Sequence, residues 1–215
     1  MISSVEFSCL SPQKIRDISV CEVVTDELYD NGRPKFGGLR DPRFGVSSRR
    51  GVCEACSKTW TNCSGHFGHY ELPHPVYHIG WITEVVYWLR RICNHCGRIS
   101  KKENGKKCPF CKAQCHRINK MNSTTLRVTD QNGMHDLHAP DAWEMLKKAS
   151  PEDILKLRPD GFQPSWLILT VLPIPPNCVR PSPTLDGDEV RGEDDITRRL
   201  LYVIRVCKGY TKIKN

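Results

Sequence analysis

The stretch that decides the fold reads CEACSKTWTNCSGH and spans residues 53–66. It places Cys53, Cys56, Cys63 and His66 in two pairs, and two residues separate the members of each pair. At this spacing both side chains of a tight turn reach one ion, and four S/N ligands close the tetrahedral shell of zinc. The pattern therefore predicts a structural zinc site. His69 is a rival fourth ligand, but His66 is favoured because it completes the two-residue spacing.

A second stretch, CNHCGRISKKENGKKCPFC over residues 93–111, repeats the arrangement. Its ligand candidates are Cys93, Cys96, Cys108 and Cys111. The eleven residues between the two pairs suit a zinc-ribbon hairpin. Cys115, His95 and His116 lie close enough in sequence to replace one of the four. Two separate redox dithiols are a weaker interpretation, because one ion explains both pairs together.

Composition favours metal ligation over disulfides. The chain has 215 residues, 12 cysteines and a formal net charge of +8. The first ten residues carry no basic segment of the kind that opens a signal peptide, so a reducing, intracellular compartment is expected. The longest stretch without charged residues, 161–179, contains four prolines, so no membrane-spanning helix is expected.

Periodicity predicts a mixture of short helices and strands. Helices are expected from Pro12, over residues 82–92, after Pro140, from Pro151, and over residues 196–207 with an end at Gly209. Residues 166–172, WLILTVL, have the composition of a buried strand. The expected class is α+β, an irregular zinc-stabilised module with a zinc-ribbon head and few regular sheets.

Basic residues concentrate in two segments, as expected of a surface that meets phosphates without reading sequence. The nucleic-acid-binding candidates are Arg40, Arg43, Arg49 and Arg50 in the first segment, and Lys101, Lys102, Lys106 and Lys107 in the second. The arginines could instead pair with acids of another subunit. No credible catalytic set is present, because the cysteines are assigned to metal and the histidines cluster with them.

Several motifs occur in an order that resembles one family. They are LSP at 10–12, GGLRDPRFG at 37–45, CSGHFGH at 63–69, WLILTVLPIPP at 166–176, VRP at 179–181 and RGEDDIT at 191–197. Together they resemble the N-terminal clamp region of the largest subunit of multisubunit DNA-directed RNA polymerase. The similarity is greatest to the archaeal and eukaryotic RNA polymerase II branch, and it covers nearly the whole chain.

The resemblance implies a clamp that grips DNA and the RNA–DNA hybrid during transcription. It assigns the eight ligand candidates to two structural zinc ions. The nucleotidyltransferase chemistry is implied to occur elsewhere, because the family's Asp-rich magnesium loop has no counterpart here. Asp186-Gly187-Asp188, the nearest string, lacks the third aspartate. The segment itself is therefore expected to be non-catalytic.

The resemblance also implies partners and a division of the chain. Expected partners are the second-largest subunit, the remainder of the largest subunit and transcription factors at the clamp, with no membrane. The location would be the nucleus in a eukaryote, or the cytoplasm for an archaeal or viral protein. Residues 1–92 would form the first part of the clamp core with zinc site 1, 93–138 the clamp head with zinc site 2, and 139–215 the returning core segment. The alternatives are a free-standing zinc-ribbon protein that binds nucleic acid or regulates the polymerase, and a non-functional gene fragment.

Overall fold

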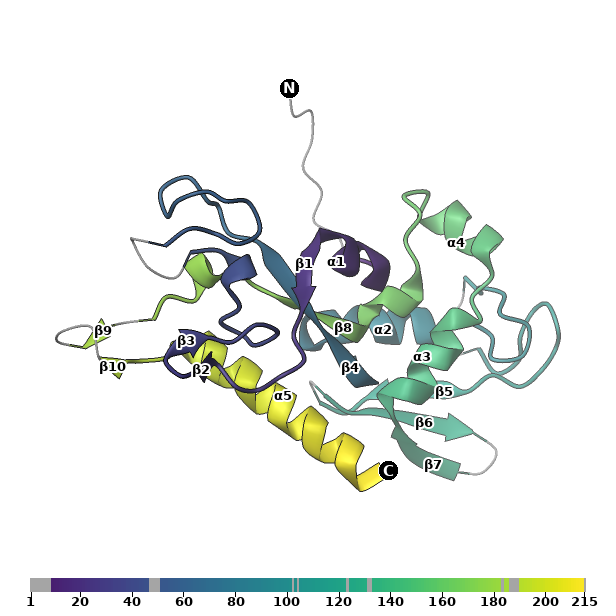
Figure 1. Cartoon of the computed structure of the whole chain (residues 1–215). Coiled ribbons are helices and arrows are strands. Elements are labelled where there is room, and N and C mark those ends of the chain that lie inside the picture. Colours follow the sequence, from purple (N-terminus) through teal and green to yellow (C-terminus); the bar gives the residue numbers. More distant parts are fainter. Residues whose placement is uncertain are drawn as a thin grey trace. The chain divides into compact units, whose positions relative to one another are not determined.

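The computed structural model describes residues 9–46, 51–101, 103, 105–122, 124–130, 133–182, 184–185 and 190–214. Figure 1 shows short helices and small sheets, as the α+β expectation requires. The helices are α1 (Pro12–Ile18), α2 (Ile82–Leu89), α3 (Ala139–Lys147), α4 (Pro151–Leu157) and α5 (Asp195–Lys214). The strands are β1 (Ser19–Glu22), β2 (Tyr29–Asp30), β3 (Arg33–Pro34), β4 (Phe67–Tyr77), β5 (Arg117–Lys120), β6 (Leu126–Asp130), β7 (Gly133–Leu137), β8 (Ile168–Ile174), β9 (Thr184–Leu185) and β10 (Val190–Arg191). Short 3-10 helices occur at η1 (Pro42–Phe44), η2 (Ile79–Trp81), η3 (Pro164–Leu167) and η4 (Asn177–Val179).

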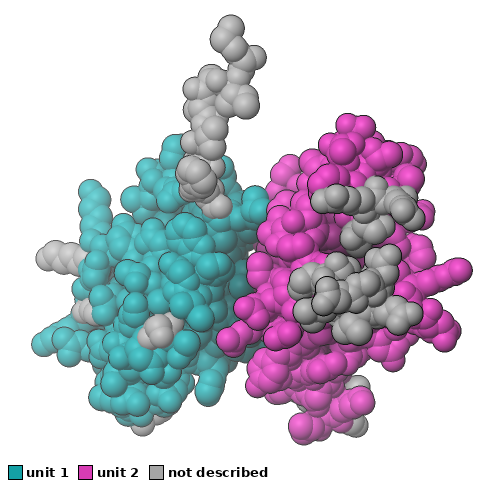
Figure 2. All heavy atoms as spheres, turned by 90° about the vertical axis from the view of Figure 1, so that its left-hand side faces the viewer, with its two compact units in different colours: residues 1–11, 74–170 teal, residues 12–73, 171–215 magenta. Residues whose placement is uncertain are grey.

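The chain divides into two compact units, coloured separately in Figure 2. Unit 1 comprises Met1–Ser11 and His74–Thr170, and unit 2 comprises Pro12–Pro73 and Val171–Asn215. Strands β4 and β8 each begin in one unit and end in the other. The strand order of the larger sheets is β1-β4-β8 and β5-β6-β7. The segment between the two halves of unit 2 thus forms nearly all of unit 1.

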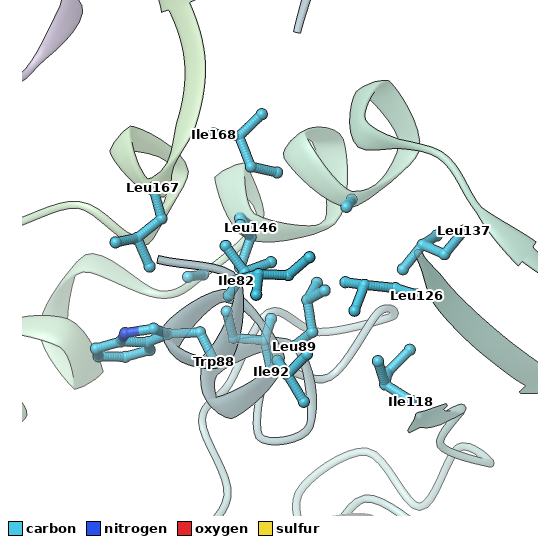
Figure 3. Close-up of a cluster of buried hydrophobic side chains, with 14 of the residues drawn as sticks. Ile82, Trp88, Leu89, Ile92, Ile118, Leu126, Leu137, Leu146, Leu167 and Ile168 are labelled. Carbon is cyan, nitrogen blue, oxygen red and sulfur yellow. The ribbon is translucent and has the colours of Figure 1, made fainter. Parts of the chain in front are cut away.

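The core of unit 1 forms around α2. Its apolar residues recur at helical spacing, so Ile82, Val85 and Leu89 fall on the buried face. Side chains from α3 and from the antiparallel β5-β6-β7 sheet meet this face, as Figure 3 shows. Ile118 and Leu126 of the sheet are fully buried there. This cluster supports the segment that carries the second group of cysteines.

Unit 2 has its own core beside α5. Leu201 and Ile204 of the helix pack with Phe44 and Ile174 in one buried cluster. Gly68 of β4 lies so close to Phe44 that a Cβ there would be 2.0 Å from the phenyl ring. A side chain at position 68 would therefore displace Phe44 from the centre of this core.

The predicted helices are all present, but α2 ends at Leu89, before the expected end at residue 92, and α5 is longer than expected. It continues through Gly209 to Lys214. A glycine inside a helix costs only about 1 kcal/mol relative to alanine, which the flanking helix formers and the buried residues of α5 can offset. The predicted strand at 166–172 lies instead at Ile168–Ile174, because Pro164–Leu167 form a 3-10 turn. Among the described residues, no helix is both long and apolar enough to cross a membrane.

Candidate metal centres

Three Cys-x-x-Cys turns share one backbone design. The amide of the first cysteine donates to the carbonyl five residues later, as in Cys53 to Lys58 at 3.0 Å and Cys93 to Arg98 at 3.0 Å. The residue four positions after each first cysteine returns an amide to that cysteine's carbonyl. This residue has a positive φ in each turn: 56° at Ser57, 69° at Gly97 and 61° at Lys112. The left-handed residue reverses the chain, so that both thiols of a turn lie on the same side.

The first turn meets the Cys63–His66 pair. The Sγ atoms of Cys56 and Cys63 are 3.6 Å apart, and Cys63 Sγ is 3.6 Å from His66 Nε2. Ligand atoms of Cys53, Cys56, Cys63 and His66 all lie within 4.8 Å of one another. His69 is not in this group, because its Nδ1 is 2.7 Å from the Ser19 hydroxyl and its Nε2 is 3.7 Å from Glu71.

The second centre is formed by the other two turns. Cys93 and Cys111 have Sγ atoms 3.6 Å apart, and those of Cys96 and Cys108 are 3.7 Å apart. All four ligand atoms again lie within 4.8 Å of one another. Cys115 lies outside this group of four and hydrogen-bonds weakly to a backbone carbonyl.

The other two spare candidates also lie outside the second group. His116 Nδ1 is 2.6 Å from the side-chain amide of Asn94, so this histidine belongs to a local contact beside the turn. His95 is exposed within its turn. The regular two-residue spacing therefore selects the same four cysteines that the structure brings together.

Both groups fit a tetrahedral ion by geometry and by chemistry. Sulfur atoms about 2.3 Å from a shared zinc are about 3.8 Å apart, close to the separations found here. A disulfide needs a sulfur–sulfur distance of only about 2.05 Å, and all twelve cysteines are free. A hydrogen bond with His66 lowers the pKa of the Cys56 thiol to about 7. Burial opposes ionisation of Cys108, yet backbone N–H groups of Cys111 and Phe110 help to lower its pKa to about 7. Burial raises the pKa of the Cys53 and Cys96 thiols, so the thiols of each group ionise unevenly; thiolate is the form that binds metal.

The arginines expected to face nucleic acid have a different environment. The side chain of Arg40 is 2% exposed; its Nε is 2.9 Å from Glu193 and its Nη2 is 3.2 Å from Asp194. Arg43 is partly exposed and forms two hydrogen bonds to buried Asp41. The acids that pair with both arginines thus belong to this chain. Arg40 is thus buried in an ion-pair network within unit 2.

The lysines of the second segment have the expected exposure. Lys101, Lys106 and Lys107 are all exposed, and the ion pairs formed between described residues involve none of them. Arg49, Arg50 and Lys102 lie outside the described residues, as do Asp186 and Asp188.

A buried polar network beside Arg40 was not anticipated. Arg180 is fully buried and donates to the carbonyls of Leu39 at 2.8 Å and Pro175 at 2.9 Å. Asn177 donates to the carbonyls of Asp41 and Gly45. The GGLRDPRFG, VRP and RGEDDIT motifs therefore meet in one place. The order of these motifs along the sequence singled them out, but it did not reveal that they contact one another.

Comparison with known proteins identifies the family of this chain. The model of the family described as RNA polymerase Rpb1, domain 1, matches residues 1–130 and 99–214. The chain belongs to this family. The matched ranges include all three motifs that meet in unit 2.

Three similar proteins from archaea share the name DNA-directed RNA polymerase subunit Rpo1N. The chain is 37% identical to DNA-directed RNA polymerase subunit Rpo1N of Methanocaldococcus jannaschii, over 95% of this chain and 18% of the relative. It is 32% identical to Rpo1N of Sulfolobus acidocaldarius, over 96% of this chain and 27% of the relative. Rpo1N of Methanococcus vannielii is 35% identical over 95% of this chain and 27% of its own length. The chain thus spans about a fifth to a quarter of the length of these relatives.

Proposed function

We propose that this chain forms the clamp portion of the largest subunit of a DNA-directed RNA polymerase and grips DNA and the RNA–DNA hybrid. The observation that carries the proposal is the family match along the chain, combined with two four-ligand centres beside exposed lysines. A free-standing regulator and a non-functional fragment are less favoured, because the match extends through both units. Nucleotidyl transfer would take place in another part of the polymerase, where magnesium is held.

Both centres are proposed to hold zinc in a structural role. Four S/N ligands at each centre complete a tetrahedron and leave no position for water, whereas a catalytic zinc keeps one position open. Structural zinc binds peptides with about 10–16 kcal/mol, comparable to the net stability of a whole domain. Bound zinc would crosslink its four ligands and so keep the turns rigid.

The nucleic-acid contacts are assigned to exposed lysines of the second segment. Lys101, Lys106 and Lys107 are exposed and lie between Cys96 and Cys108 in the sequence, so a rigid centre would hold their charges in place. Ammonium groups neutralise phosphates without reading bases, as a processive enzyme requires. Arg43, Arg49, Arg50 and Lys102 remain candidates of the same kind, whereas Arg40 is not included.

The remaining assignments follow from the same proposal. The second-largest subunit, the rest of the largest subunit and transcription factors would be partners. Residues 93–138 would form the clamp head between the core segments 1–92 and 139–215. Reduced thiols require an intracellular compartment, and the archaeal relatives favour the cytoplasm.

Charge reversal tests the proposal. Polymerase would be assembled with Lys106→Glu and Lys107→Glu in this chain, and the lifetime of promoter complexes measured against salt. We expect a shorter lifetime and a salt dependence weaker by up to about one unit of logarithmic slope per lost phosphate contact. Lys147→Glu with Lys148→Glu, exposed lysines of unit 1 at the end of α3, is the matched control. Equal lifetimes for both double variants, or failure of the chain to join the second-largest subunit, would refute the proposal.

A further inference from the structure

Unit 1 contains an open groove of about 850 Å³. Four structural segments form its walls: the end of α2, the loop after Cys96, the turn between Cys108 and Cys111, and α4. Its apolar lining includes Tyr87, Ile99, Pro109, Phe110 and Leu157. The volume lies within the range of pockets that enclose a small ligand or a few side chains.

Two aromatic rings of the groove are already covered by guanidinium groups. Arg91 lies 3.6 Å from the centre of the Tyr87 ring, and Arg98 lies 4.5 Å from the centre of the Phe110 ring. A base that stacked on either of these faces would have to displace a cation–π contact. The rings therefore serve better as the side wall for an inserted apolar side chain.

The rim of the groove has an excess of positive charge. Lys101 and Lys156 are exposed at its edge. Among the described residues that line it, the acidic one is Asp153, which is 7% exposed and accepts bonds from Arg98 at 2.7 Å and from the Ile99 amide at 3.0 Å. The acid is thus neutralised internally, so the unpaired charge at the opening is cationic.

We propose that this groove docks an acidic segment of a protein partner, which inserts one or two apolar side chains between Phe110 and Leu157. Exposed phenyl and leucyl groups supply the apolar contact: Phe110 is 50% exposed and Leu157 is 50% exposed. Carboxylates that flank the inserted side chains would face Lys101 and Lys156. This charge complementarity orients the segment and accelerates its association.

The second metal centre also shapes the groove. Pro109 and Phe110 lie between the ligand candidates Cys108 and Cys111, so their position depends on how that turn is held. Loss of metal would therefore remove one wall, and docking should disappear with it. The proposal does not depend on nucleic-acid binding by Lys106 and Lys107, which do not line the groove, whereas Lys101 lines it and also belongs to the proposed nucleic-acid surface.

Fluorescence anisotropy with the zinc-loaded full chain tests the docking site. The probe is a labelled peptide of Glu and Asp that carries one Phe and one Leu four positions apart, and its control has both replaced by Ala. Leu157→Ser should weaken binding of the probe roughly tenfold, since it removes one buried side-chain contact. Lys156→Glu should weaken binding about fivefold by reversing a rim charge.

Two matched control variants also lie in unit 1. Leu155 is 55% exposed on α4 but does not line the groove, and Lys148 is an exposed lysine just after α3. Leu155→Ser and Lys148→Glu should leave binding unchanged. The proposal is overturned if the Ala peptide binds equally well, or if Leu155→Ser and Leu157→Ser have the same effect. It is also overturned if Leu157→Ser weakens the binding of a labelled oligothymidylate but leaves the binding of the peptide unchanged.

Discussion

Replacing Arg40 by alanine would test whether a buried ion-pair network stabilises unit 2. The guanidinium of Arg40 has two acidic partners, Glu193 and Asp194, and also donates to the carbonyl of Arg180. The acidic side chains are only 16% and 17% exposed, so they cannot recover full hydration when the arginine is lost. The variant thus leaves two poorly solvated carboxylates and one unpaired carbonyl.

The expected loss follows from this burial. Removing one partner of a buried ion pair destabilises a protein by about 3–5 kcal/mol. In a chain of this length each kcal/mol shifts the melting temperature by about 2–4 °C, so a decrease of about 6–20 °C is expected. Arg16 provides the control within unit 2, because it pairs with Glu71 while both side chains are 39% exposed. Arg16→Ala should change stability by no more than about 1 kcal/mol.

Thermal unfolding followed by circular dichroism, in zinc-containing buffer, measures both variants. Because Arg40 is not expected to contact phosphate, the salt dependence of nucleic-acid binding should be unchanged in the folded Arg40→Ala variant. If Arg40→Ala were no less stable than Arg16→Ala, the network would not hold unit 2 together. If only the salt slope changed, the arginine would belong to the nucleic-acid surface instead.

Three further perturbations address unit 1. Chelation of metal should abolish its protease resistance and much of its circular dichroism, whereas an unchanged signal would contradict a structural role for zinc. Gly97→Ala should destabilise by at least about 2 kcal/mol in chemical unfolding, because φ is 69° and a Cβ would lie 1.9 Å from the Lys148 carbonyl oxygen. Gly161→Ala, with φ of 76° and no atom within 4 Å of the Cβ, should be milder, and equal losses would exclude the close approach as the cause. The Arg98 ion pair lowers the pKa of Asp153. The free energy of unfolding of the unsubstituted chain should therefore exceed that of Asp153→Asn by a constant amount above about pH 5, and this difference should diminish from about pH 4 downwards. An advantage that grew with acid, in urea unfolding at each pH, would contradict this sign.

The two candidate metal centres were the most predictable part of the molecule, since the structure brings the expected side chains together. Their ligands are close in sequence, and the two-residue spacing itself dictates a turn that directs both thiols to one side. Helices with clear starts, such as α4 at Ser150-Pro151, were predictable for the same local reason. The β5-β6-β7 sheet was not, because strands such as β7 are exposed along most of their length and show no alternation of apolar and polar residues.

The environment of the arginines could not be predicted locally. Sequence shows that Arg40 is charged, but its partners Glu193 and Asp194 follow more than 150 positions later. Only the fold brings them together and buries the group. The same limit applies to Arg180, whose isolated position between prolines gives no indication that its guanidinium bonds two loop carbonyls and a threonine hydroxyl.

The two-part construction of unit 2 has a consequence for synthesis on the ribosome. Residues 12–73 emerge early, yet the acids that neutralise Arg40 arrive 153 and 154 positions after it. At a synthesis rate of about 5–20 residues per second, Arg40 is made roughly 8–30 s before Glu193 and Asp194. The intervening stretch of unit 1 is contiguous and can assemble during that delay. The order of synthesis thus favours folding of unit 1 first and of unit 2 last.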